Sequence, residues 1–397
     1  MDDKSNDDMA VERLLQYISI DTVQPCPKYN DVVKFMEEYA SEIPVLDFFS
    51  DKLPSGFPYV VLTWNSQNTL LPGILLNSHM DVVPFDVGKW TKGKPFGLRS
   101  SDGMIYGRGT QDMKSIAIIQ IEAIRRLSQS GFIPKRNVYI LLIPDEEVGG
   151  HLGMNQLVKS KFFTDHKIAL ALDEACPSPT NEYLIAIDER YPYWIDFQFT
   201  GRTGHGSLPN CPEFSSERFR TVFNMLYDLH KQNVIDINTP LDLLQLGNII
   251  TANLTKMSGG IQTNIIPSEL NATFDIRVPP KMIDTFVEVL DAISSMDGVE
   301  IHYQTRPIIS KVVESEAIQW ATDITDIFKK MDLKCLTMTM PGTTDMRYIR
   351  ELGIPAIGLS PFNNTPIAIH DHDEFISEDV FCFGIKIYTE LLKSLLS

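Results

Sequence analysis

The stretch that most constrains the fold is residues 75–84, an apolar run that ends in polar residues and a proline. It predicts a buried strand that presents His79 and Asp81 at its carboxyl end. Open α/β sheets bind their ligands at this end of their strands, so His79 is a candidate metal ligand. In an extended segment Asp81 points to the same side as His79 and can accept a hydrogen bond from its ring. A histidine near a strand end is often satisfied structurally, so this prediction needs further ligands.

Other short apolar runs recur between segments with helical periodicity. Because these runs lack alternation, they predict central strands that are covered on both faces, and hence an α/β domain. The predicted strands are Tyr59–Trp64, Ile74–Asn77, Val138–Ile143 and Ile168–Leu172.

The clearest predicted helix runs from Asp112 to Ser130. Apolar residues recur along it at helical spacing, and Gly131 supplies the stop. We expect its charged residues to face solvent: Lys114, Glu122, Arg125 and Arg126. Asp112 stands where the helix begins, so its carboxylate can also be a simple N-cap.

A second domain is indicated near Asp188, where strands with one polar face begin. The succession of strands and helices over 188–305 is βαββαβ-like, and it can bury a core of its own. We therefore predict a domain 188–305 inserted into a domain formed by 1–187 and 306–397.

Composition limits the classes of partner. The formal net charge is −17, and no basic run occurs, which argues against nucleic acid and against an anionic membrane. Five scattered cysteines fit free thiols in a reducing compartment. The acidic, polar residues 1–8 do not resemble a signal peptide, so we expect a cytoplasmic protein.

Further candidate ligands follow other predicted strands. Two imidazoles and three carboxylates form an N/O set that suits zinc, or cobalt or manganese, and one carboxylate can bridge two ions. Because Glu146 and Glu147 are adjacent, we expect one to be a ligand and the other a base for the attacking water. A lone Glu-Glu pair can otherwise be a solvated loop. The candidates besides His79 are Asp112, Glu146, Glu147, Glu174 and His370.

Five motifs in order along the chain resemble the di-zinc amidohydrolases, a family that includes aminoacylases, carboxypeptidases, desuccinylases and carnosinases. Within this family the chain is most similar to the aminoacylases, on residues 149–154, 347–350 and 360–366. The five motifs are residues 77–84, 106–114, 144–150, 172–174 and 370–374.

The resemblance implies a site with two Zn²⁺ ions per subunit. It makes His79, Asp112 and Glu174 ligands of one ion, and Asp112, Glu147 and His370 ligands of the other, so that Asp112 bridges. It makes Glu146 the general base and Asp81 the partner of His79. It also implies a cis peptide bond after Asp112, and the family spacing selects His370 rather than His372.

The resemblance further implies a zinc-hydrolase catalytic domain, with a mostly parallel sheet and helices on both faces, and an inserted ferredoxin-like lid through which a homodimer forms. His205 matches a histidine that stabilises the oxyanion in the neighbouring subunit's site. Asn264, Arg277 and Thr344 match substrate-binding positions. His205 could otherwise be a turn residue, and Arg277 a surface or ion-pair residue.

The implied activity is zinc-dependent hydrolysis of N-acyl-L-amino acids to a carboxylate and a free L-amino acid. The alternatives are a dipeptidase, a carboxypeptidase or a hydrolase of fatty-acyl amino acids with the same site. A metal-binding dimer without catalysis is a further alternative of a different class.

Overall fold

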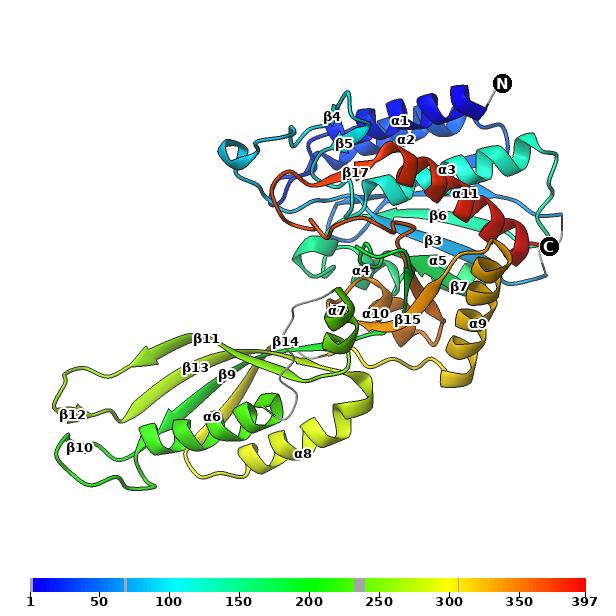
Figure 1. Ribbon diagram of the computed structural model, residues 1–397. Coiled ribbons are helices and arrows are strands. Elements are labelled where there is room, and N and C mark those ends of the chain that lie inside the picture. The colour runs from blue at the N-terminus through cyan, green and yellow to red at the C-terminus, as the bar shows by residue number, and fades with distance from the viewer. Residues whose placement is uncertain (1–2, 68–69, 232–239, 306) are drawn as a thin grey trace. The chain divides into compact units, whose positions relative to one another are not determined.

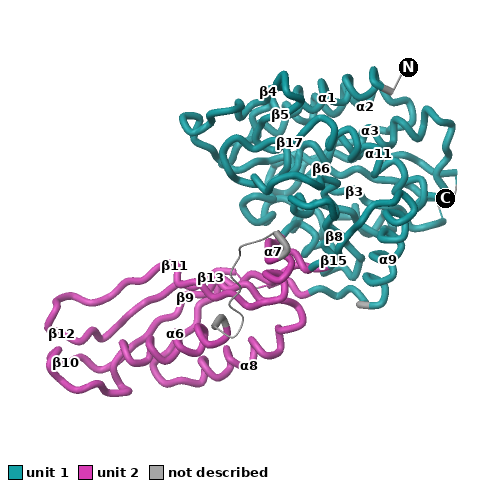
Figure 2. The backbone as a smooth tube through the Cα atoms, in the orientation of Figure 1, with its two compact units in different colours: residues 1–187, 310–338, 344–397 teal, residues 188–309, 339–343 magenta. Residues whose placement is uncertain are grey.

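The structure is a computed structural model, and it describes residues 3–67, 70–231, 240–305 and 307–397 (Figure 1). The chain divides into two compact units (Figure 2). Unit 1 comprises Met1–Ile187, Ser310–Met338 and Thr344–Ser397, and unit 2 comprises Asp188–Ile309 and Thr339–Thr343. The boundary expected at residue 306 lies outside the described residues.

The main sheet has eight strands in the order β1-β2-β6-β3-β7-β16-β8-β15. Its strands are β1 (Leu46–Lys52), β2 (Pro58–Trp64), β3 (Gly73–His79), β6 (Val138–Ile143), β7 (Ile168–Asp173), β8 (Tyr183–Glu189), β15 (Cys335–Met340) and β16 (Ala356–Leu359). The neighbours β6, β3, β7 and β16 run parallel, as expected, and β3 and β6 are buried along their whole length.

Beyond these central strands the described pairings are antiparallel, so the sheet as a whole is mixed. β2 pairs antiparallel with β1 and β6, and β16 pairs antiparallel with β8. The reason for the β1–β2 pair is the length of its connection. A parallel pair needs a crossover of about a dozen or more residues, whereas the short segment between Lys52 and Pro58 allows only a hairpin.

Helices cover both faces of this sheet, which confirms the expected α/β class. In Figure 1, α3 and α11 lie on one side of β3 and β6, and α4 and α5 lie on the other. The helices of unit 1 are α1 (Asp3–Ser19), α2 (Tyr29–Ser41), α3 (Lys114–Gln129), α4 (Met154–Leu157), α5 (Lys161–Asp165), α9 (Glu314–Lys330), α10 (Met346–Glu351) and α11 (Glu378–Leu395). A small sheet of this unit has the order β17-β5-β4, with β17 (Phe375–Ser377), β5 (Met104–Tyr106) and β4 (Leu98–Arg99).

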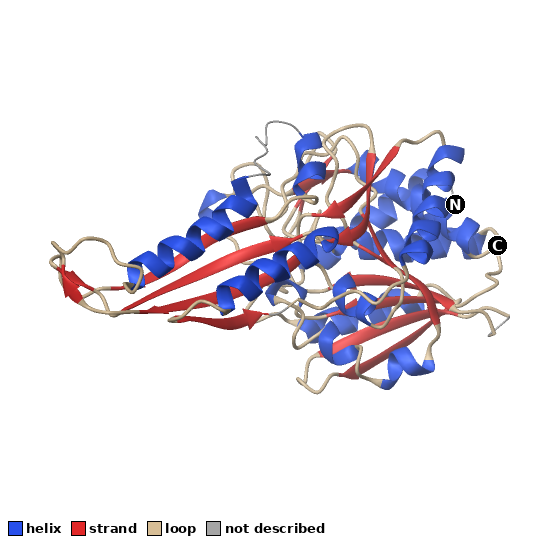
Figure 3. Cartoon of the chain, turned by 90° about the horizontal axis from the view of Figure 1, so that it is seen from below, coloured by secondary structure: helices blue, strands red, loops and turns tan. Residues whose placement is uncertain are grey.

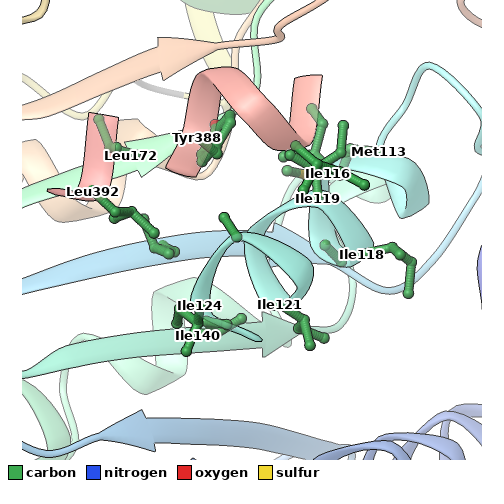
Figure 4. Packing of buried hydrophobic residues seen from close by; sticks show 14 of the residues in the cluster. Met113, Ile116, Ile118, Ile119, Ile121, Ile124, Ile140, Leu172, Tyr388 and Leu392 are labelled. Atoms are coloured by element: carbon green, nitrogen blue, oxygen red, sulfur yellow. The ribbon is translucent and has the colours of Figure 1, made fainter. Parts of the chain in front are cut away.

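Helix α3 lies at the centre of the core of unit 1. It contacts α1, α11, β3 and β6, and Figure 4 shows its Ile124 beside Ile140 of β6. This position makes one expectation wrong, because Lys114, Glu122 and Arg125 are buried rather than solvent-facing. A helix that is covered all round must pair its charges, since an unpaired buried charge is costly.

Those buried charges have partners within unit 1. The ammonium of Lys114 donates to the backbone oxygens of Tyr17 and Ile20, at 3.2 and 2.9 Å. The carboxylate of Glu122 accepts from the hydroxyl of Tyr39 and lies 3.1 Å from Nε of Arg125. The polar face of α3 therefore joins it to the helices around it.

Unit 2 has the expected βαββαβ order. Its antiparallel sheet has the order β11-β13-β9-β14, which is the ferredoxin-like arrangement. Its elements are β9 (Tyr191–Thr200), β10 (Gly204–His205), α6 (Ser215–Lys231), α7 (Pro240–Leu246), β11 (Thr251–Gly259), β12 (Ile265–Ile266), β13 (Glu269–Val278), α8 (Ile283–Ser294) and β14 (Val299–Thr305). Figure 3 shows α6 and α8 lying along this sheet, over a core of its own.

Two further features concern the surroundings of the protein. All five cysteines are free thiols, as expected. Among the described residues, no helix combines the length and the apolar character that crossing a bilayer requires.

Candidate metal centre

The parallel strands of unit 1 bring several candidate ligands to one edge of the sheet. His79 is the last residue of β3, and Glu174 directly follows β7. Glu147 lies in the 3₁₀ helix η2 (Glu146–Val148), which follows β6 after a left-handed residue, Asp145, with φ 78°. Since β6, β3 and β7 are parallel neighbours, their carboxyl ends lie together.

Two further candidates come from loops of the same unit. Asp112 lies between β5 and α3, and its peptide bond to Met113 is cis, as the resemblance implied. His370 lies in the segment before β17 and has φ 65°. The candidate ligands therefore come from three strand ends and from these two loops.

The side chains form two overlapping groups that could each hold a metal ion, His79–Asp112–Glu174 and Asp112–Glu147–His370. In the first, Nε2 of His79 lies 2.7 Å from Oδ1 of Asp112 and 3.6 Å from Oε1 of Glu174. In the second, Nε2 of His370 lies 3.1 Å from Oδ2 of Asp112 and 3.0 Å from Oε2 of Glu147. Each oxygen of Asp112 thus faces a different histidine, which is the geometry of a bridging ligand.

The pKa values of the side chains in the two groups fit the binding of cations. Burial raises the pKa of Glu174 well above its usual range and that of Glu147 to about 7. Hydrogen bonds with Asp112 and Glu147 raise the pKa of His370 to about 10. Glu147 Oε1 is buried and has no hydrogen-bond partner among the described residues. Carboxylates and imidazoles that converge in this way need compensating positive charge, which protons or metal ions can supply.

Asp81 is placed differently from the expectation. Its carboxylate Oδ1 lies 3.9 Å from Nδ1 of His79, beyond hydrogen-bond distance, and the ring nitrogen instead lies 2.9 Å from the backbone oxygen of Asp81. The carboxylate accepts from the backbone N–H groups of Glu146 and Glu147, each at 3.2 Å. Asp81 therefore holds the His79 ring with its main chain and the η2 turn with its side chain.

Sequence reasoning did not find Gln24, whose amide Nε2 donates to Asp81 Oδ2 at 2.7 Å. Nothing near Gln24 in the sequence marks this contact, because the two residues lie far apart in the chain.

Glu146 belongs to neither ligand group, and burial raises its pKa well above the usual range. Of the two carboxylates in η2, Glu147 belongs to a ligand group and Glu146 does not, so Glu146 stays available for proton transfer.

Two of the other predicted site residues, His205 and Asn264, lie on neighbouring segments of unit 2. His205 pairs with Ile265 between the short strands β10 and β12, and the N–H of Gly206 donates to the backbone oxygen of Asn264 at 2.8 Å. His205 and Asn264 are both exposed, and Nδ1 of His205 lies 2.8 Å from the hydroxyl of Ser207.

Arg277 and Thr344 already have intramolecular contacts. Within unit 2, the guanidinium of Arg277 forms a bidentate pair with Asp275, at 2.7 and 3.1 Å, and donates to Oγ1 of Thr343 at 3.2 Å. The alternative of an ion-pair residue therefore describes Arg277 in this structure. Thr344, in unit 1, is buried, and its hydroxyl accepts from the N–H of Met346 at 3.2 Å.

Residues 75–394 match the profile described as peptidase family M20/M25/M40. The chain belongs to the M20 family. This confirms the family resemblance drawn from the five motifs. This M20 chain is 37% identical over 392 residues to aminoacylase-1 of Sus scrofa, covering 98% of this chain and 95% of that protein.

Solved structures of M20 proteins share the fold. The M20 family metallo-carboxypeptidase Sso-CP2 of Sulfolobus solfataricus has a TM-score of 0.71 at 18% identity, covering 97% of this chain and 98% of that one. The YXEP protein of Bacillus subtilis, described as a dinuclear metal binding peptidase, has a TM-score of 0.67 at 13% identity, covering 99% of both chains. This M20 chain is thus a family hydrolase with a candidate metal-binding cluster.

The overlap of the two groups predicts unequal effects of ligand substitutions on metal content. Asp112→Ala removes the shared carboxylate, so both ions should be lost, whereas His370→Ala should leave one ion bound. His372→Ala is the matched control, because that histidine belongs to neither group. Elemental analysis of dialysed proteins measures the stoichiometry. Equal metal content in the Asp112 and His370 variants would contradict the shared geometry.

Proposed function

We propose that this chain is a zinc-dependent N-acyl-L-amino-acid amidohydrolase that releases a carboxylate, such as acetate, and a free L-amino acid. The observation that supports this most is the pair of ligand groups that share Asp112, found in a chain 37% identical to a protein named aminoacylase-1. Unit 1 is then the catalytic domain, and unit 2 is the lid and dimerisation domain. Free cysteines fit our further proposal of a cytoplasmic enzyme.

In this proposal His79, Asp112 and Glu174 hold one zinc ion, and Asp112, Glu147 and His370 hold the other. The donor set supports this assignment, because imidazole and carboxylate with no thiolate is typical of catalytic zinc. When bound, the ions supply Lewis acidity that polarises the scissile carbonyl and makes a water molecule more acidic.

The proton transfers belong to Glu146. A carboxylate oxygen of Glu146 takes a proton from the water as its oxygen bonds to the acyl carbon, and then gives that proton to the leaving nitrogen as the C–N bond breaks. The support is positional. Glu146 belongs to neither ligand group but adjoins Glu147, and Asp81 holds the backbone of both residues.

Recognition of substrate falls to residues outside the metal groups. We assign Asn264 and Arg277 to the substrate, with Thr344 lining the pocket. The guanidinium of Arg277 suits a free α-carboxylate, which would replace Asp275 as its bidentate partner. His205 stabilises the oxyanion in the site of a neighbouring subunit.

The homodimer is supported by the surface of unit 2. β11 is an edge strand, and its Leu254 and Met257 are 38% and 54% exposed. Ile261, just beyond it, is 92% exposed. An open strand edge with exposed apolar side chains is a favourable place for two copies to pair.

Replacement of Glu146 tests the base. Glu146→Gln removes the proton acceptor but no ligand, so kcat should fall by about 10²–10⁴-fold while metal content stays at the wild-type value. Steady-state kinetics with elemental analysis measures both quantities. Glu37→Gln, an exposed carboxylate on α2, controls for the change of charge. Near-normal turnover by the Glu146 variant would refute this role.

A substrate panel tests the reaction itself. N-acetyl-methionine should be hydrolysed with a higher kcat/KM than dipeptides, C-terminally blocked analogues or long-chain acyl amino acids, and a chelator should abolish the activity. A preference for dipeptides would favour a dipeptidase or carboxypeptidase, and a preference for long acyl chains would favour a fatty-acyl amino acid hydrolase. Bound metal with no turnover of any substrate would leave a non-catalytic protein.

Subunit mixing tests the role of His205. His205→Ala and Glu146→Gln should each be nearly inactive alone. If His205 serves the neighbouring subunit, each mixed dimer has one intact site, so equal mixing after subunit exchange should restore about a quarter of wild-type activity. A mixture that stays as inactive as its components would contradict a shared site.

A further inference from the structure

Glu374 is a buried carboxylate that the proposed reaction does not use. It lies four residues after His370, directly before β17, and its side chain is 0% exposed. All of its described partners come from the loop that ends at Asp112. Oε1 accepts from the N–H of Gln111 at 2.7 Å, and Oε2 accepts from the N–H of Gly109 at 3.1 Å and lies 2.7 Å from Nη1 of Arg108.

The same two segments are joined by further contacts. The N–H of Gly107 donates to the backbone oxygen of Glu374 at 3.0 Å. The amide of Gln111 donates to the backbone oxygens of Pro366 and Phe375, at 3.0 and 2.8 Å, and its Oε1 accepts from the N–H of Ala368 at 2.9 Å. The segment 366–375, which contains His370, is therefore bound at both ends to the loop 107–112.

We propose that Glu374 is a positioning residue that sets the spacing between Asp112 and His370, and so the affinity of the ligand group that contains both. This inference rests on the proposed metal site. His370 is held by no strand of its own and has a left-handed backbone, so its place depends on the contacts of its segment. Glu374 joins that segment to the loop by hydrogen bonds from the backbone N–H groups of Gly109 and Gln111, and Gln111 directly precedes Asp112.

The carboxylate is required here, and an amide of the same size would not replace it. An ionised carboxylate only accepts hydrogen bonds, and its two oxygens meet the N–H groups of Gly109 and Gln111 together with the guanidinium of Arg108. In Glu374→Gln one oxygen becomes an NH₂ group that faces these donors. The substitution also leaves the buried charge of Arg108 without its carboxylate.

The two ligand groups should respond differently to this change. The group Asp112–Glu147–His370 contains a residue from each of the two segments. The group His79–Asp112–Glu174 contains only Asp112 from these segments, and its other two residues come from the ends of β3 and β7. A shift between the two segments should therefore weaken one ion much more than the other. A general loss of stability would have no such preference.

The experiment is a zinc titration of metal-free Glu374→Gln and wild-type protein by calorimetry, with kinetics at each zinc concentration. Wild type should bind two ions tightly. The variant should bind one ion tightly and the second about 10- to 100-fold more weakly, as for other residues that orient metal ligands. Its kcat should recover as zinc is raised, whereas KM should stay near the wild-type value.

Asp373→Asn is the matched control. Asp373 is the neighbouring carboxylate and accepts N–H groups of Thr91, Lys92 and Gly93, at 2.9 to 3.1 Å, but it touches no residue of 107–112 in the described contacts. The Asp373→Asn variant should still bind two zinc ions with wild-type affinity, even if its midpoint of thermal unfolding falls. If Glu374→Gln does not fold, Arg108→Lys, which shortens the cation that pairs with Glu374, should weaken the same ion in a milder form.

The outcomes separate the two proposals. A Glu374 variant, or failing that the Arg108 variant, with both ions as tight as in wild type overturns this inference and leaves the proposed function intact. Equal weakening of both ions, or the same selective loss in Asp373→Asn, overturns it as well. Wild-type protein that binds fewer than two ions refutes the di-zinc site itself.

Discussion

The shared carboxylate of Asp112 is the interaction on which the site depends. Its two oxygens face two histidines, and these histidines belong to different ligand groups. Although burial acts to raise it, the hydrogen bonds with His370 and His79 keep the pKa of Asp112 below its usual value. A carboxylate that stays ionised in a buried position must be surrounded by positive charge, because the desolvation penalty of a buried ion is several kcal/mol. The surrounding chain is arranged to collect that charge at one place.

The parallel core and the loops have different parts in this arrangement. β3 and β6 are buried strands and β7 is largely buried, and the edge that they share carries His79, Glu174 and the start of η2. Asp112 and His370 have no strand of their own, and the backbone is left-handed at His370 and at Asp145, the residue before η2. Such positions need support from hydrogen bonds to neighbouring segments, and Asp81 supplies it for η2.

The sequence predicts most of this centre, because the signals are local. Val138–Ile143 is entirely apolar, so a central strand follows from periodicity alone, and its bounds agree with those of β6. The five candidate ligand residues stand in motifs that lie at strand ends or in the loops beside them, and the structure brings their side chains together. These features depend on residues that are close in sequence, or on a sheet edge that any parallel sheet has.

What could not be predicted depends on contacts between distant segments. Glu122 is polar by type, and only the packing of α3 among α1, α11 and the sheet shows that it must be buried beside Tyr39 and Arg125. The bounds of β11 could not be read from the sequence, because its residues are mostly exposed and no apolar face marks it. The spacing of His79 and Asp81 suggested a contact between their side chains. The carboxylate of Asp81 instead accepts hydrogen bonds from the N–H groups of η2, and it lies 3.9 Å from the His79 ring nitrogen.

The division between units bears on how one chemistry serves different substrates. Every residue of the two ligand groups belongs to unit 1, whereas His205, Asn264 and Arg277 belong to unit 2. A protein described as an aminoacylase is similar to this chain in sequence, and one described as a metallo-carboxypeptidase shares its fold. Metal ions and a base act on any amide in the same way, so selectivity among amides must come from groups that touch the rest of the substrate. Under the proposed function, substitutions of the unit 2 residues assigned to the substrate would alter substrate choice while the two ligand groups of unit 1 stay the same.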